Sequence, residues 1–319
     1  MKKFVSMLLI FMLVVIAFST SAFAAKSTYL SIGTGSVTGV YYPLGGALAS
    51  IISNQMDGYS CAAESTGGAV ENASLLIDNK IDLGFVAAST LYDAQHGLDA
   101  FEGKDGTKVQ ALFSFFPEVV QIIAVDPSIK TIPDLAGKRV AVGSAGSGTE
   151  VMARAILALY DMSYDDISED YLGFGDAASG LKDGTVDVAF TWAGVPTASV
   201  MELSATHNIS LISFTDKELE KLMSVSSYCV PATITKETYP KMYEEAQSFS
   251  IPAIICASSE LSEDFVYDFM VKVFENTDIL AQTHERGADL SLETALDGLD
   301  DATLHPGAER FFREKGILK

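Results

Sequence analysis

Three observations predict an α/β protein with mostly parallel strands. Short apolar runs alternate with amphipathic stretches along the chain. Glycine and hydroxyl residues gather after predicted strands and before predicted helices, where open parallel sheets bind their ligands. The same alternation restarts after Asp126–Pro127. We therefore expect two units of ordinary domain size, with glycine turns from both units facing one ligand.

The first unit alternates strands and helices and ends in two extended runs with no helix between them. In order, we expect a strand at 29–33, a helix at 43–55, a strand at 61–65, a helix at 69–79, a strand at 82–88, a helix from 89 and extended runs at 109–116 and 119–125.

The second unit repeats this order and leads back to the first. In order, we expect a short helix and a strand within 131–143, a Gly-Ser turn and long helix within 144–160, a strand at 170–175, a helix at 176–184, a strand at 187–194, helices at 196–206 and 217–224, an extended run at 228–235, a strand at 251–258 and helices at 263–282 and 305–316. We therefore assign 25–126 and 228–319 to lobe I and 127–227 to lobe II.

The first residues predict a cleaved signal peptide over 1–24. Lys2 and Lys3 precede an apolar run at 7–18, and Ala22 and Ala24 form a small-residue cleavage site. The run is short for a transmembrane anchor. We expect a mature chain that begins near Ala25 and is periplasmic.

Charge argues against two classes of partner. The formal charge of −21 becomes −23 once Lys2 and Lys3 leave with the signal peptide. Such a chain repels nucleic acid and anionic membrane surfaces.

The chain has an odd number of cysteines for an oxidising compartment, namely Cys61, Cys229 and Cys256. Two arrangements stay open: a Cys229–Cys256 disulfide bridge with one free thiol, or three buried free thiols.

The sequence carries no strong motif for catalysis, a cofactor or a metal. Gly33, Gly35 and Gly39 do not have the dinucleotide spacing, and no acidic residue follows about twenty positions on. The serines within 143–148 lack the G-x-S-x-G pattern, and Gly148 is followed by Thr149 and not by the lysine of a phosphate loop. The histidines have no partner pattern, so we expect them on the surface, and no metal-ligand spacing occurs.

Capture of an anion without chemistry remains. Helix N-termini carry unpaired N–H groups and about half a positive charge, so they hold carboxylates well. Physiological salt screens distant surface charge beyond about 8 Å, so the overall acidity does not prevent this.

Several blocks resemble the TAXI receptors, the extracytoplasmic receptors of tripartite TRAP uptake systems. The matching blocks lie at 33–49, 65–76, 82–94, 135–157, 193–200, 238–240 and 304–316, in one collinear order. The resemblance implies a type II periplasmic-binding-protein fold, with two α/β lobes joined by a hinge around the ligand. It also implies a small carboxylate solute such as glutamate or 2-oxoglutarate, delivery to a TRAP membrane permease, and no enzymatic activity. We expect a monomer.

The sequence departs from the family in two ways. Ala87 and Ser89 stand where these receptors often carry Gln and Asp, and Trp192 stands where smaller aliphatic residues are common. The first change removes an amide and a charge, so two readings stay open: a larger site, or a ligand without an amino group. Trp192 either floors the site or belongs to the core beside the hinge.

The glycine and hydroxyl turns give the candidate ligand residues. They are Gly33, Thr34, Tyr41, Ser65, Thr66 and Ser89 from lobe I, and Ser147, Gly148, Thr149, Trp192 and Gly194 from lobe II. Residues 147–149 are the leading candidates because they open a long helix after a strand, although Ser147 or Thr149 could serve only as an N-cap. An exported hydrolase and a ligand-sensing subunit remain alternatives.

Overall fold

The computed structural model describes residues 27–226 and 228–319. The predicted signal peptide lies outside these residues. Within them, no helix combines the length and the apolar composition needed to cross a membrane.

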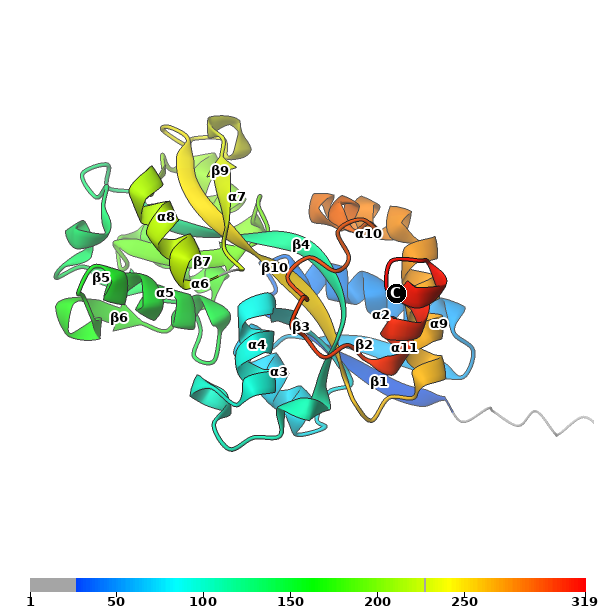
Figure 1. Cartoon of the computed structure of the whole chain (residues 1–319). Helices are drawn as coiled ribbons and strands as arrows, with labels where there is room; N and C mark the ends of the chain where they lie inside the picture. The colour runs from blue at the N-terminus through cyan, green and yellow to red at the C-terminus, as the bar shows by residue number, and fades with distance from the viewer. Residues whose placement is uncertain (1–26, 227) are drawn as a thin grey trace, which may run out of the picture.

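The helices and strands form two halves joined by two long strands (Figure 1). The first half contains β1 (Thr28–Gly33), α2 (Tyr41–Gln55), β2 (Tyr59–Glu64), α3 (Ala69–Ile77), β3 (Leu83–Ala87), α4 (Ala88–His96), α9 (Glu263–Glu275), α10 (Thr277–Thr283) and α11 (Pro306–Glu314). The second half contains β5 (Arg139–Ala141), α5 (Gly148–Leu159), β6 (Ser168–Asp170), α6 (Phe174–Asp183), β7 (Val188–Ala193), α7 (Ala198–Thr206), β8 (Ser210–Leu211), α8 (Asp216–Val225) and β9 (Val230–Ile234). The joining strands are β4 (Val109–Ala124) and β10 (Ala246–Ser258).

One mixed sheet runs through both halves. Its order is β2-β1-β3-β10-β4-β7-β5-β6, with β8 paired to β4 and β9 paired to β10. The outer pairs β1–β2, β1–β3, β5–β6 and β5–β7 are parallel, whereas β4 and β10 run antiparallel to their partners. The expected α/β class is confirmed, but the sheet is mixed because the two strands that cross between the halves run antiparallel to each other and to their neighbours.

The two extended runs predicted at 109–116 and 119–125 are parts of one strand. Strand β4 pairs with β10 up to Val119 and with β7 from Val119 onward. Pro117 of β4 lies opposite Pro252 of β10, and neither residue has an N–H to donate to the ladder. The exchange of partner strands therefore occurs where the ladder is weakest.

Core packing places one segment differently from the predicted lobe boundary. Ile234, Tyr239, Met242 and Ala246 pack in an apolar cluster with residues of β7, α6 and α7. The prediction placed residues 228–319 in lobe I, but this cluster places the segment around β9 with the second half. The sequence did not show this because β9 joins the second half through long-range pairing to β10.

The predicted helix at 263–282 is divided at Asn276 into α9 and α10.

The three cysteines are free thiols, with Cys229 and Cys256 buried and Cys61 half-buried. The bridge between Cys229 and Cys256, which the sequence left open, is not formed.

Candidate functional site

A small cavity of about 50 Å³ lies where the two halves meet. First-turn or N-cap residues of five helices line it, namely Val40 and Tyr41 of α2, Gly68 and Ala69 of α3, Ala87 of α4, Ser147 to Thr149 of α5 and Phe174 of α6. Each helix N-terminus contributes a positive end of its macrodipole. No Lys, Arg or His belongs to the described lining residues, so backbone N–H groups supply the positive potential.

The N-terminus of α5 offers unpaired donors to this cavity. Ser147 is its N-cap, and the Ser147 Oγ accepts a hydrogen bond from the Glu150 N–H at 3.1 Å. The N–H groups of Gly148 and Thr149 have no acceptor in the described part of the chain. The Thr149 side chain is buried and forms no hydrogen bond with a described residue. Ser147 therefore caps the helix, whereas Gly148 and Thr149 leave donors free for a ligand.

The N-terminus of α3 meets the loop before α5. The Glu71 N–H donates to the Gly146 carbonyl oxygen at 3.0 Å, and the Gly67 N–H donates to the Glu71 carboxylate. A Cβ at Gly67 would lie 2.8 Å from the Ala145 carbonyl oxygen. The two halves are thus in direct contact through their backbones.

A buried carboxyl group also faces the cavity. Glu118 of β4 is 4% exposed, and its Oε2 accepts a hydrogen bond from the Tyr41 hydroxyl at 2.6 Å. Burial raises the pKa of Glu118 to about 8, and the hydrogen bond from Tyr41 opposes only part of that rise. The Tyr41 ring stacks on Phe85 at 4.6 Å, which fixes the hydroxyl in place.

Trp192 combines the two roles that the sequence left open. It is 6% exposed, and its Nε1 donates to the Glu118 carbonyl oxygen at 3.0 Å. It also lines the small cavity and packs against Gly148, where a Cβ would lie 3.0 Å from the Trp192 ring. Trp192 is a core residue that also forms a wall of the site.

Four other predicted residues support the glycine loop from behind. The Ser65 hydroxyl donates to the Gly35 carbonyl oxygen at 2.8 Å, and the buried Thr34 hydroxyl donates to the Glu64 carbonyl oxygen at 2.6 Å. Thr66 donates to the Asn72 side chain at 2.7 Å, and Gly33 leaves the space that Asn72 occupies. These residues hold the loop that includes Gly35, and they do not line the cavity themselves.

The last two predicted residues lie in other surroundings. Ser89 lines a separate cavity of about 260 Å³ on the other side of Trp192, beside Asp93. Gly194 packs under Arg286 and Phe116. Of the predicted set, the cavity therefore brings together Tyr41, Ser147, Gly148, Thr149 and Trp192. Which of them contact a solute stays a prediction.

Two central residues were not predicted from the sequence. Asn72 is fully buried, and its amide donates to the carbonyl oxygens of Thr34 and Phe85 at 2.7 and 2.8 Å. Glu118 was passed over because it follows Pro117 inside an apolar run. The available signal was that Glu118 is the only charged residue in a mostly apolar strand, because a charged residue is rarely buried without a purpose.

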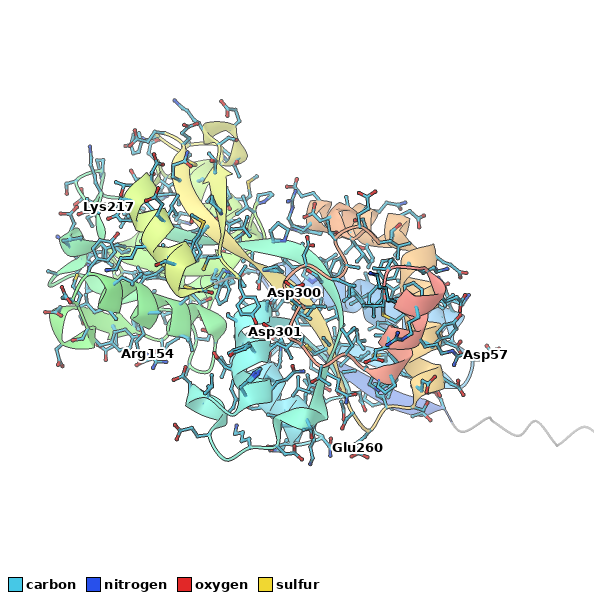
Figure 2. All side chains as sticks on the ribbon, viewed as in Figure 1. Asp57, Arg154, Lys217, Glu260, Asp300 and Asp301 are labelled. Atoms are coloured by element: carbon cyan, nitrogen blue, oxygen red, sulfur yellow. The ribbon has the colours of Figure 1, made fainter. Side chains whose placement is uncertain are left out.

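The largest of these cavities, about 640 Å³, lies elsewhere and has a different character. Four aspartates and one arginine line it, namely Asp289, Asp297, Asp300, Asp301 and Arg286. Figure 2 shows Asp300 and Asp301 near the middle of the molecule. Its excess of carboxylates opposes an anionic ligand, so we place the candidate site in the smaller cavity.

The described residues contain no cluster of three or more metal-ligating side chains. No histidine lines the small cavity. His305, expected on the surface, is buried at 1% exposure because it caps α11 by accepting a hydrogen bond from the Gly307 N–H at 3.2 Å. The cavity serines therefore have no histidine beside them in the part of the chain that the structure describes.

Known protein families and solved structures show which proteins this chain is similar to. The family model described as NMT1-like matches residues 32–316. The chain belongs to the NMT1-like family. This match covers both halves and every element that lines the candidate site.

Solved structures share the fold at low sequence identity. One described as a periplasmic transporter has 15% identity and a TM-score of 0.51, over 92% of this chain and 93% of that chain. A protein of Bordetella bronchiseptica RB50 has 16% identity and a TM-score of 0.50, over 92% and 83%. An L-cystine ABC transporter protein, described as putative, from Listeria monocytogenes has 16% identity and a TM-score of 0.49, over 83% and 98%. The first two likenesses support the two-lobed α/β fold and extend no further than the fold.

Proposed function

We propose that this protein is an extracytoplasmic solute-binding receptor that captures a small carboxylate between its lobes and delivers it to a TRAP-type membrane permease. One observation carries the proposal. Five helix N-termini converge on a cavity that has free N–H donors and, among the described residues that line it, no basic side chain. Such donors bind a carboxylate through charge-assisted hydrogen bonds worth about 1.5–3 kcal/mol each.

The size of the cavity narrows the class of solute. About 50 Å³ is room for roughly four water molecules at the 10–15 Å³ that each requires. A compact acid fits best, and glutamate or 2-oxoglutarate requires the lobes to separate slightly around it.

The direct test is a thermal-shift panel of organic acids and amino acids, followed by calorimetry on each compound that stabilises the protein. We expect one-to-one binding of a small carboxylate. At one hundred times the dissociation constant, binding stabilises the folded state by about 2.7 kcal/mol. A panel in which only neutral or cationic compounds bind would contradict the proposal.

The permease partner needs a second experiment. In proteoliposomes that contain a TRAP permease, the loaded receptor should drive uptake without ATP. Uptake that requires ATP hydrolysis would instead indicate an ABC permease.

The alternative function, an exported hydrolase, predicts turnover of ester or amide substrates, whereas a receptor should bind its solute without turnover.

A further inference from the structure

The Glu118 carboxyl group stands out because the site is otherwise arranged for anions. It lines the cavity and is 4% exposed, and no basic side chain lies among the described residues that line the cavity with it. Its Oε2 is held by the Tyr41 hydroxyl at 2.6 Å, while its Oε1 accepts no hydrogen bond from any described residue. An ionised carboxylate here would repel the solute that the helix N-termini attract.

We propose that Glu118 is a specificity-determining residue that stays protonated and donates a hydrogen bond from its free oxygen to the carboxylate of the solute. This inference rests on the proposed function. It assigns the solute class as acids that need no amino group, and it couples capture to the uptake of a proton. The alternative is an ionised Glu118 paired with the ammonium group of an amino acid.

The surroundings of Glu118 favour the protonated form. Tyr41 is the only other titratable side chain among the described lining residues. From β10, burial raises the pKa of Cys256, so its thiol is neutral. The first turns of α3, α5 and α6 carry Glu71, Glu150 and Asp176, which are acidic and do not line the cavity. No neighbouring cation stabilises the carboxylate, and burial raises the pKa of Glu118 to about 8.

The dependence of solute affinity on pH has a definite direction. A bound carboxylate adds a like charge and raises the pKa of Glu118 further, so the complex holds a proton that the free protein loses at high pH. Affinity is therefore full below about pH 7 and falls as the pH rises through 8, by up to about tenfold for each pH unit. Pairing with an ammonium group gives the opposite sign, with affinity rising through the same range.

The test is calorimetry with 2-oxoglutarate, which lacks an amino group, and with L-glutamate, which has one, from pH 6 to pH 9.5. For 2-oxoglutarate we expect the dissociation constant to increase about tenfold between pH 7 and pH 9. We also expect uptake of about one proton at pH 8.5, measured from the binding heats in two buffers of different ionisation enthalpy.

Two variants isolate Glu118. Glu118→Gln keeps an N–H donor, so it should bind 2-oxoglutarate at pH 7 within about threefold of wild type and lose the decline above pH 8. Tyr41→Phe removes the hydrogen bond that favours the ionised form, so the decline should move to higher pH. Tyr41→Phe reports on the same proton if Glu118→Gln fails to fold.

Three results would overturn the inference. The first is 2-oxoglutarate affinity that does not vary with pH, and the second is retention of the decline in Glu118→Gln. The third is binding of L-glutamate alone that strengthens above pH 8. If wild type binds no carboxylate at any pH, the proposed function fails and this inference fails with it, whereas each of the three results leaves the receptor role intact.

Discussion

The backbone N–H of Glu71 lies 3.0 Å from the carbonyl oxygen of Gly146, and this bond joins α3 of the first half to the loop before α5 of the second. This contact brings together the N-termini of α3 and α5, which both line the candidate site. Because Gly67 and Gly148 of these segments both line the cavity, contact between the halves and formation of the candidate site depend on the same residues. A change that separates these segments should weaken solute binding without touching a ligand contact.

Gly67→Ala should oppose closure. Its Cβ would lie 2.8 Å from the Ala145 carbonyl oxygen, so the loops have to move apart. We expect at least tenfold weaker binding of the solute found in the panel, and a larger radius of gyration by small-angle scattering in the presence of that solute. Gly46→Ala on α2 is the matched control, because nothing lies within 4 Å of a Cβ there. Equal affinity in both variants would show that the contact at Gly67 does not govern closure.

Thr149→Val should separate ligand binding from helix capping. The Thr149 hydroxyl has no partner among the described residues, so its loss should weaken carboxylate binding by about 1.5–3 kcal/mol and leave the melting temperature of the free protein nearly unchanged. Thr149→Ser keeps the hydroxyl and should bind normally. Calorimetry and thermal melts of both variants check this, and unchanged affinity in Thr149→Val would remove the residue from the site.

Ser147→Ala should show the opposite profile. The Ser147 hydroxyl caps α5 through the Glu150 N–H at 3.1 Å, so its removal should lower the free energy of unfolding by about 0.5–2 kcal/mol. If capping is the main role of Ser147, the solute affinity of the folded protein should change by less than about threefold. Denaturant unfolding measures the first effect and calorimetry the second. A large loss of affinity with no loss of stability would assign Ser147 to the ligand.

The stability of the free protein should fall with rising pH between the pH at which Glu118 ionises in the unfolded chain and the pH at which it ionises in the folded protein. Its pKa in the folded state, about 8, lies above the usual 4.5, so its contribution is fully present below about pH 4.5 and is lost as pH approaches 8. Each pKa unit corresponds to about 1.4 kcal/mol, so the loss is on the order of a few kcal/mol.

Urea unfolding of wild type and Glu118→Gln at pH 5 to pH 9 measures this loss. The difference between the two proteins should shift in favour of the variant as pH rises. Glu260→Gln, at an exposed position labelled in Figure 2, should follow wild type throughout. Parallel pH curves for wild type and Glu118→Gln would contradict a buried Glu118 that is protonated at neutral pH.

The three cysteines should react as thiols. Alkylation of the unreduced, denatured protein should add three labels by mass spectrometry, because Cys61, Cys229 and Cys256 are free. In the native protein, labelling of Cys256 should be slow, since it is fully buried and burial raises its pKa. A mass that shows only one label after denaturation would indicate the Cys229–Cys256 bridge.

Several parts of the fold could be predicted from local patterns. Strand β1 and helices α3 and α5 lie within a few residues of their predicted positions, because apolar periodicity and glycine turns are local features of the chain. The turn before α5, predicted as a site element for the same reason, lines the cavity. The sequence could not show which residue of this turn caps the helix and which residues leave donors free. That depends on which oxygen atom accepts the hydrogen bond from the Glu150 N–H.

Long-range pairing explains the misplaced boundary. The segment around β9 looked like a return to the first lobe, but its residues pair with β10 and pack with the core of the second half. Strands that pair across a long loop leave no periodic signal of their partner. For the same reason, the sequence did not show that the two predicted extended runs form one strand, β4. Pro117 separates the two runs in the sequence, but in the sheet β4 continues through Pro117 and then changes its partner strand from β10 to β7.

The sequence by itself determined the alternation of strands and helices, the glycine turns at helix N-termini, and hence the expectation of an anion site, because each of these follows from neighbouring residues. Only the tertiary structure decided which turns meet. It brought the N-termini of α3 and α5 together through Glu71 and Gly146, and it left Ser89 in a separate cavity behind Trp192. It also placed Glu118 among those helix N-termini. Burial and proximity set the pKa and the role of a side chain, and both arise only when distant segments pack.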